Sequence, residues 1–178
     1  MCPRISEMPY SLLALVGTDL SEASRNGRLA QPIALSQGFE LIPLAAPDLT
    51  RLSGDDRLVG GDNAFPQLLT PTASEKLSKL QIDRFAYLEI DCFGGDCNHS
   101  AAVYDGSQPR WMGSQIHAEL NHPVSGERLL FMRPTNIALR AIGVQLGDSR
   151  DELEALGLTN PPWRQAWWNF ERFSLSSK

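Results

Sequence analysis

The sequence lacks a membrane segment and a secretory cysteine pattern. None of its apolar runs reaches the roughly 18 residues that a membrane-spanning helix needs. The apolar stretch at 11–17 is too short for the core of a signal peptide, and no small-x-small cleavage pattern follows it. The 3 cysteines are too few, and odd in number, for the disulfide framework of a small secreted domain. We therefore expect a protein of the reducing cytoplasm.

The motifs of common catalytic and phosphate-binding sites are also missing. The chain has no G-x-S-x-G pattern of a serine nucleophile and no glycine-rich loop that ends in a phosphate-binding lysine. Its 3 histidines do not stand at the spacing of a metal-binding helix. The sequence therefore predicts no cofactor.

Positive charge is in the minority. The chain has 16 Lys and Arg against 21 Asp and Glu, so its net charge is −5. An acidic surface disfavours nucleic acid and anionic membranes as partners, and it favours a basic protein.

What the chain does have is the composition of one globular domain. Hydrophobic residues make up 42% and charged residues 21% of the 178 residues, enough to bury a core without disulfides or metals. We predict a single domain over 1–178. Residues 53–66 are rich in Gly and Asp and lack periodicity, which indicates a mobile loop, and we expect a disordered tail at 174–178.

Strand and helix patterns are mixed without regular alternation. Strands are predicted at 10–17, as two short segments within 31–45, and at 84–92, 97–106 and 109–117. Helices are predicted at 18–27, 70–80, 135–144 and 148–158. This order favours an α+β fold with a mainly antiparallel sheet and flanking helices.

Three of the predicted helices carry specific expectations. The helix at 70–80 begins either with Thr70 as cap and Pro71 in its first turn or with a capping box that starts at Thr72. Asp148 would cap the helix at 148–158, which would stop at Gly157 with Leu158 folded back on the helix in a Schellman-type end. The helix at 135–144 would turn one apolar stripe to the core, made of Ile137, Ala141 and Val144.

The stretch "DCFGGDCNH" at 91–99 predicts a hairpin. Gly94 and Gly95 suit the two central positions of a primed turn, which requires positive φ. Cys92 then faces Cys97, and the two strands alternate between two faces. One face would collect Ala86, Leu88, Ile90, Cys92, Cys97, His99, Ala101 and Val103, and the other Phe85, Tyr87, Glu89, Asp91, Asn98, Ser100, Ala102 and Tyr104.

The first of these faces offers a metal site as one alternative. Cys92, Cys97 and His99 are three ligands, whereas a structural zinc takes four, and no second ligand pair follows. Buried cysteines act as small hydrophobic residues, so a core role is favoured. A cross-strand disulfide is geometrically feasible, but a reducing compartment argues against it.

The second face offers a small enzyme as another alternative. Glu89 and Asp91 stand two apart on one strand, and paired carboxylates can perform acid–base chemistry. No nucleophile or base is placed beside them by the sequence, so a hydrogen-bonded sheet face is favoured.

Several of these patterns occur together in one kind of protein. Acidic Glu89 and Asp91 precede "FGG" at 93–95, "AAV" and an Asp-Gly turn follow at 101–106, and "DELEALGL" stands at 151–158 before a tryptophan-bearing tail. Together with the Asn-bearing helix that ends in "GV" and the similar start "YSLLALV", they cover most of the chain. The set resembles a family of small bacterial proteins that look like immunity proteins of contact-dependent or type VI secreted toxins. The chain departs from that pattern at Cys92, Cys97 and His99.

The resemblance and the acidic charge together favour binding over catalysis. We expect an immunity protein that binds and occludes a cognate, basic toxin, with no catalytic residues and no metal. Tryptophan is a common anchor in interfaces, although the aromatic cluster at 163–173 also suits packing of a last helix. The predicted partner-binding residues are Asp55, Asp56, Asp62, Asp148, Asp151, Glu152, Trp163 and Trp167.

Overall fold

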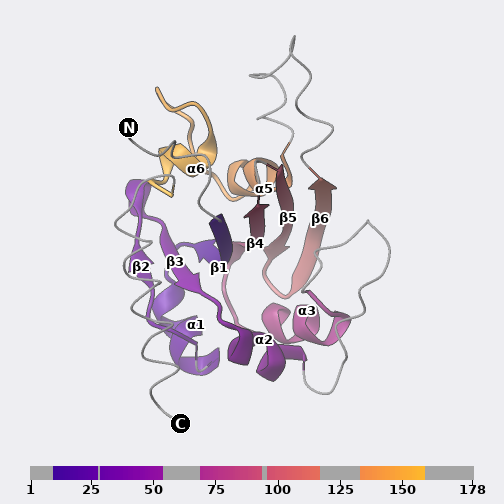
Figure 1. The fold of residues 1–178 in the computed structure, drawn as a ribbon. Coiled ribbons are helices and arrows are strands. Elements are labelled where there is room, and N and C mark those ends of the chain that lie inside the picture. Colours follow the sequence, from indigo (N-terminus) through magenta and orange to yellow (C-terminus); the bar gives the residue numbers. More distant parts are fainter. Residues whose placement is uncertain (1–9, 28, 54–68, 94–95, 117–132, 159–178) are drawn as a thin grey trace, which may run out of the picture.

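The computed structural model describes residues 10–27, 29–53, 69–93, 96–116 and 133–158 (Figure 1). Within these ranges, six strands form one antiparallel sheet in the order β2-β3-β1-β4-β5-β6. The strands are β1 (Tyr10–Gly17), β2 (Ile33–Ala34), β3 (Glu40–Pro43), β4 (Arg84–Phe93), β5 (Asp96–Asp105) and β6 (Gln108–Ile116). The helices are α1 (Leu20–Gly27), α2 (Ala46–Ser53), α3 (Pro71–Ser78), α5 (Pro134–Ala141) and α6 (Glu152–Ala155), with a 3₁₀ turn at Ser36–Gly38. The predicted single α+β domain is confirmed.

The strands β4 and β5 pair in the register that the double glycine predicts. Phe93 pairs with Asp96, Cys92 with Cys97, and the register continues without a shift to Arg84 and Asp105. Gly94 and Gly95 themselves lie outside the described residues. The predicted tail at 174–178 lies outside them too, and so does the predicted loop at 53–66 apart from its first residue. Ser53 is the last residue of α2.

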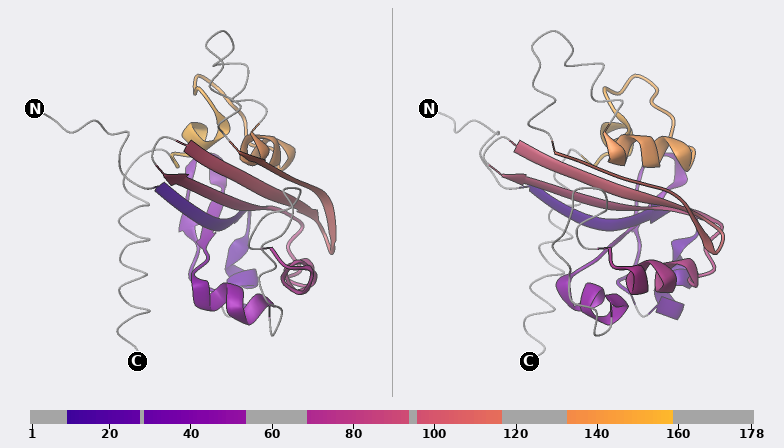
Figure 2. Two further views of the ribbon diagram at one scale, coloured as in Figure 1. Left: turned by 45° about the vertical axis from the view of Figure 1, so that its right-hand side comes forward. Right: turned by 90° about the vertical axis from the view of Figure 1, so that its right-hand side faces the viewer.

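Helices cover both faces of the sheet, which gives three layers (Figure 2). The face that carries Ala86, Leu88 and Val103 packs with α5 and α6 into one hydrophobic core. The opposite face, which carries Tyr87 and Ala102, packs with α1, α2 and α3 into a second core. Successive residues of β4 therefore enter different cores, and a slip of one residue would exchange them.

The described helices are short. Four of them span 8 residues each, and none in the described part of the chain is long and apolar enough to cross a membrane. The helix α2 was not expected from the sequence. Its signal was Asp48, whose carboxylate accepts a hydrogen bond from the backbone amide of Ala45 at 2.9 Å and so caps the first turn.

Two of the three expectations about helix ends are confirmed. Thr70 caps α3, accepting a hydrogen bond from the Ala73 amide at 3.1 Å, with Pro71 in the first turn. The amide of Leu158 donates to the Leu153 carbonyl at 2.8 Å, which closes α6 in the Schellman-type end. The cap of α6, however, is Asp151 and not Asp148. Asp148 lies one turn too early, because residues 145–150 run as a loop.

The predicted stripe of α5 was wrong at two of its three residues, since only Val144 lies buried in the core as expected. Ala141 is exposed and Ile137 is only half-buried, whereas Ala138, Leu139 and Ile142 lie in the core beside α6. The prediction placed only one side of the helix against the core. In the structure Thr135 and Asn136 are also fully buried, because α5 meets the sheet through its first turn as well.

This correction can be tested by truncating the two candidate stripe residues. Leu139→Ala should lower the free energy of unfolding by about 2–5 kcal/mol, because the side chain is fully buried in a packed core. Ile137→Ala, the matched control on the same helix, should lower it by much less. Chemical denaturation of both variants measures the difference, and equal losses would contradict the burial of α5 described above.

Candidate functional site

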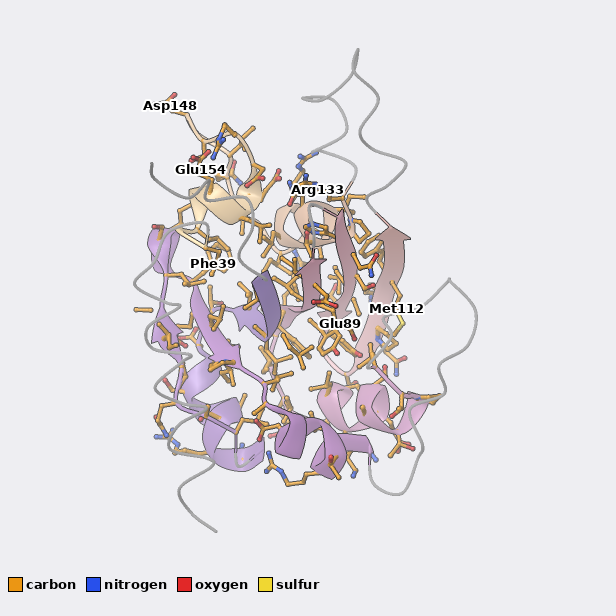
Figure 3. All side chains as sticks on the ribbon, in the orientation of Figure 1. Phe39, Glu89, Met112, Arg133, Asp148 and Glu154 are labelled. Carbon is orange, nitrogen blue, oxygen red and sulfur yellow. The ribbon has the colours of Figure 1, made fainter. Side chains whose placement is uncertain are left out.

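A buried hydrogen bond on the α1–α3 side of the sheet joins Tyr87 to Glu89. Both side chains belong to β4 and point to the same face, two residues apart. The Tyr87 hydroxyl donates a hydrogen bond to Glu89 Oε1 at 2.6 Å, and the exposed fraction of Glu89 is 9%. Figure 3 shows Glu89 on β4, within the fold. Glu89 is buried because side chains alternate between the two faces of a strand, so that Glu89 shares a face with the apolar neighbours of Tyr87.

Polar residues fill the end of this face next to Glu89. Ser100 stands directly opposite Glu89 and is buried, and Asp91 stands opposite Asn98. Asp91 is exposed and Asn98 is half-buried. The predicted carboxylate pair is therefore split between the interior and the surface. The buried member accepts a hydrogen bond from a tyrosine, which is the hydrogen-bonded arrangement that the sequence favoured.

Two buried tyrosines on this face have hydroxyl groups with raised pKa values. Burial raises the pKa of Tyr87 well above its usual value of 10.0, and the Glu89 carboxylate raises it further. Burial also raises the pKa of Tyr104, while a hydrogen bond with Ser74 of α3 lowers it. The Tyr104 ring stacks on Phe85 with centroids 4.6 Å apart. Both hydroxyls thus stay protonated where the sheet meets its helices.

On the other face, His99 lies beneath the first turn of α5. Its exposed fraction is 3%, and its Nδ1 is 2.8 Å from the hydroxyl of Thr135. Cys92 and Cys97 are paired across β4 and β5. No group of three His, Cys, Asp or Glu is arranged to hold a metal ion among the side chains that the structure describes, which do not include those of Cys92 and Cys97. The contact with Thr135 places His99 at the junction between the sheet and α5.

Charged residues join α5 to α6. Glu152 of α6 is almost fully buried, and its Oε1 accepts hydrogen bonds from Arg140 Nε at 2.8 Å and Nη2 at 2.6 Å. Burial lowers the pKa of Arg133, an effect that the Asp151 carboxylate opposes. Asp151 itself accepts a hydrogen bond from the Glu154 amide at 2.8 Å. Two of the predicted partner-binding acids thus take part in the structure of the fold.

Asp148 is the predicted partner-binding residue that lies free on the described surface. It sits in the loop between α5 and α6 and points away from the fold (Figure 3). Nearby, Glu154 binds Arg150 through an exposed ion pair at 3.1 Å. The remaining predicted residues lie outside the described ranges and stay predictions: Asp55, Asp56, Asp62, Trp163 and Trp167.

A polar clamp that the sequence did not predict holds the Asp148 loop in place. The side-chain amide of Gln37 donates to the Gln145 carbonyl at 2.8 Å, and its oxygen accepts from the Gln145 amide at 2.9 Å. Gln37 has a φ of 61°, which is uncommon for a residue other than glycine. No local signal marks this contact, because the two glutamines are far apart in the sequence.

A shallow hollow lies at the opposite end of the sheet. Its volume is about 610 Å³, and it lies between the α3–β4 connection and the β5–β6 turn. Its lining includes Lys79 and Asp83, both exposed. Neither Glu89 nor Asp91 lines this hollow.

The tyrosine pKa shifts predict how stability depends on alkaline pH. The unfolded chain loses its tyrosine protons near pH 10, whereas folded Tyr87 keeps its proton to higher pH. Stability is therefore full below pH 10 and falls as the pH rises above it. Tyr87→Phe should reduce that fall by up to about 1.4 kcal/mol per pH unit. Denaturation between pH 8 and pH 11 measures the slope, and a variant with the slope of the original protein would contradict a buried, protonated Tyr87.

The comparisons with known proteins complete this description. No family model, no curated protein and no solved structure matches the chain. The family resemblance seen in the hairpin and the α6 region accordingly stays a prediction. The described residues establish an α+β domain in which Glu89 is hydrogen-bonded to Tyr87 and His99 to Thr135.

Proposed function

We propose that this protein is a cytoplasmic immunity protein of a bacterium, which binds and occludes a cognate secreted toxin. The observation that carries the proposal is the pairing of the internal polar side chains. Tyr87 is bonded to Glu89, His99 to Thr135 and Arg140 to Glu152, so these groups serve the fold. We therefore assign binding of the toxin to the surface of the protein.

The acidic charge supports a basic partner. A net charge of −5 favours encounter with a basic protein, since complementary charge raises the association rate and suppresses wrong partners. A basic enzyme that acts on nucleic acid or on another anionic substrate has that charge. Occlusion of such an enzyme requires shape and charge on the inhibitor and no chemistry of its own.

The exposed loop between α5 and α6 is the part of the described surface that we assign to the interface. Asp148 is exposed there, and the bonds from Gln37 to Gln145 fix the backbone of the same loop. A loop that is already ordered loses little conformational entropy when it binds. The acidic residues at 55–62 and the tail tryptophans complete the proposed interface.

A co-expression experiment tests the function. The probe is the protein encoded by the gene next to this one, produced with and without this protein in the same host. We expect the neighbour alone to stop growth, and growth to return when this protein is present. We also expect the two proteins to co-purify. Toxicity that persists in the presence of this protein would overturn the proposal.

A pair of charge-reversal variants tests the assigned interface separately. Asp148→Lys should weaken binding to the same neighbour by about tenfold or more through a slower association rate, because it opposes the attraction to a basic partner. Glu22→Lys makes the same charge change on α1, in the helix layer opposite α6, and should change binding by less than about twofold. Equal effects of the two variants, with toxicity still neutralised, would place the interface elsewhere and leave the function standing.

A further inference from the structure

The hairpin of β4 and β5 brings two of the 3 cysteines together. Cys92 and Cys97 are direct partners in the antiparallel register, one pair before the strands end at Phe93 and Asp96. Directly paired residues in an antiparallel sheet have Cα atoms about 4.5 or 5.5 Å apart, depending on the hydrogen-bonding type of the pair. Both distances lie within the range of about 4.4–6.8 Å that disulfides span.

We propose that Cys92 and Cys97 form a reversible cross-strand disulfide, so that the end of this hairpin is a thiol-oxidation site. The inference rests on backbone register alone and does not depend on the proposed function. In the reducing cytoplasm the pair is a dithiol, as the sequence predicts. The disulfide forms when small-molecule disulfides accumulate.

The oxidant that this reaction needs is a low-molecular-weight disulfide such as oxidised glutathione. One cysteine thiolate attacks a glutathione sulfur, which breaks the glutathione S–S bond and releases one glutathione thiolate. The second cysteine thiolate attacks the resulting mixed disulfide, forms the Cys92–Cys97 bond and releases the second glutathione. The two cysteines are oxidised and one glutathione disulfide is reduced, and the two cysteine protons end on the released thiols.

The position of the pair in the fold indicates what the bond would affect. The ends of β4 and β5 that carry the two cysteines extend past the described helices of both layers (Figure 2). The next residues on the same face are Ile90 and His99, and His99 contacts Thr135 of α5. A bond between Cys92 and Cys97 would therefore hold together the strands on which α5 rests.

Oxidation of the full chain with glutathione disulfide tests the proposal. Intact mass should fall by two hydrogen atoms, and alkylation should find one remaining thiol of the 3, at Cys2. Peptide mapping should recover a Cys92–Cys97 linkage that dithiothreitol reverses. The melting temperature should rise by about 4 °C, since the bond closes a short loop in the unfolded chain.

Three serine variants provide the controls. Cys2→Ser should oxidise as the original protein does and keep the rise in melting temperature. Cys92→Ser and Cys97→Ser should each lose the intramolecular bond and the rise. Three thiols that all still react after oxidation, a bond that involves Cys2, or about one zinc per chain held by the reduced pair in elemental analysis would each overturn the inference.

Discussion

The pairing register of β4 with β5 is the constraint on which the rest of the structure depends. Both faces of the sheet are buried, so each successive residue of β4 must suit a different core. Leu88 and Ile90 pack with α5 and α6, whereas Phe85 and Tyr87 pack with α1, α2 and α3. A slip of one residue would place Glu89 beneath α5 and remove Leu88 from its core, at a cost of several kcal/mol for each exchanged pair.

The same register also determines which polar side chains of the sheet are buried and which partners they have. A polar side chain that alternation carries into a core must find a partner there, because an unpaired buried polar group costs about 1–3 kcal/mol. Tyr87 meets Glu89 on one face, and His99 meets Thr135 on the other. Arg140 meets Glu152 between α5 and α6 and so joins the two helices. These contacts give Glu89 and His99, two residues that suggest chemistry in the sequence, a partner inside the fold, and the proposed function accordingly relies on the surface.

Much of the central sheet could be predicted from the sequence, because local rules act there. Two glycines in a row predicted the hairpin register, and a period of two assigned the apolar residues from Phe85 to Ile90 and from Ala101 to Tyr104 to the cores in which they lie. The cap at Thr70 and the end at Leu158 followed from equally local signals. The predictions that failed concern features that depend on contacts between distant parts of the chain. The cap of α6 moved to Asp151, and the buried side of α5 was set by its packing on β5 and by α6.

In the candidate interface, too, local features could be predicted from the sequence and long-range contacts could not. The exposure of Asp148 agrees with the acidic surface expected from charge, but the burial of Glu152 depends on Arg140, which stands 12 residues earlier on another helix. The clamp from Gln37 to Gln145 joins residues 108 positions apart, and no sequence pattern announces it. Long-range contacts of this kind become visible only in the folded chain.

Cross-strand nuclear Overhauser effects between backbone protons of β4 and β5 test the register most directly. The account predicts contacts that link Ile90 with His99, Leu88 with Ala101 and Ala86 with Val103. A spectrum that instead links Ile90 with Ser100 and Leu88 with Ala102 would show a register shifted by one residue. That result would contradict the two-core arrangement and, with it, the assignment of the internal polar groups to the fold.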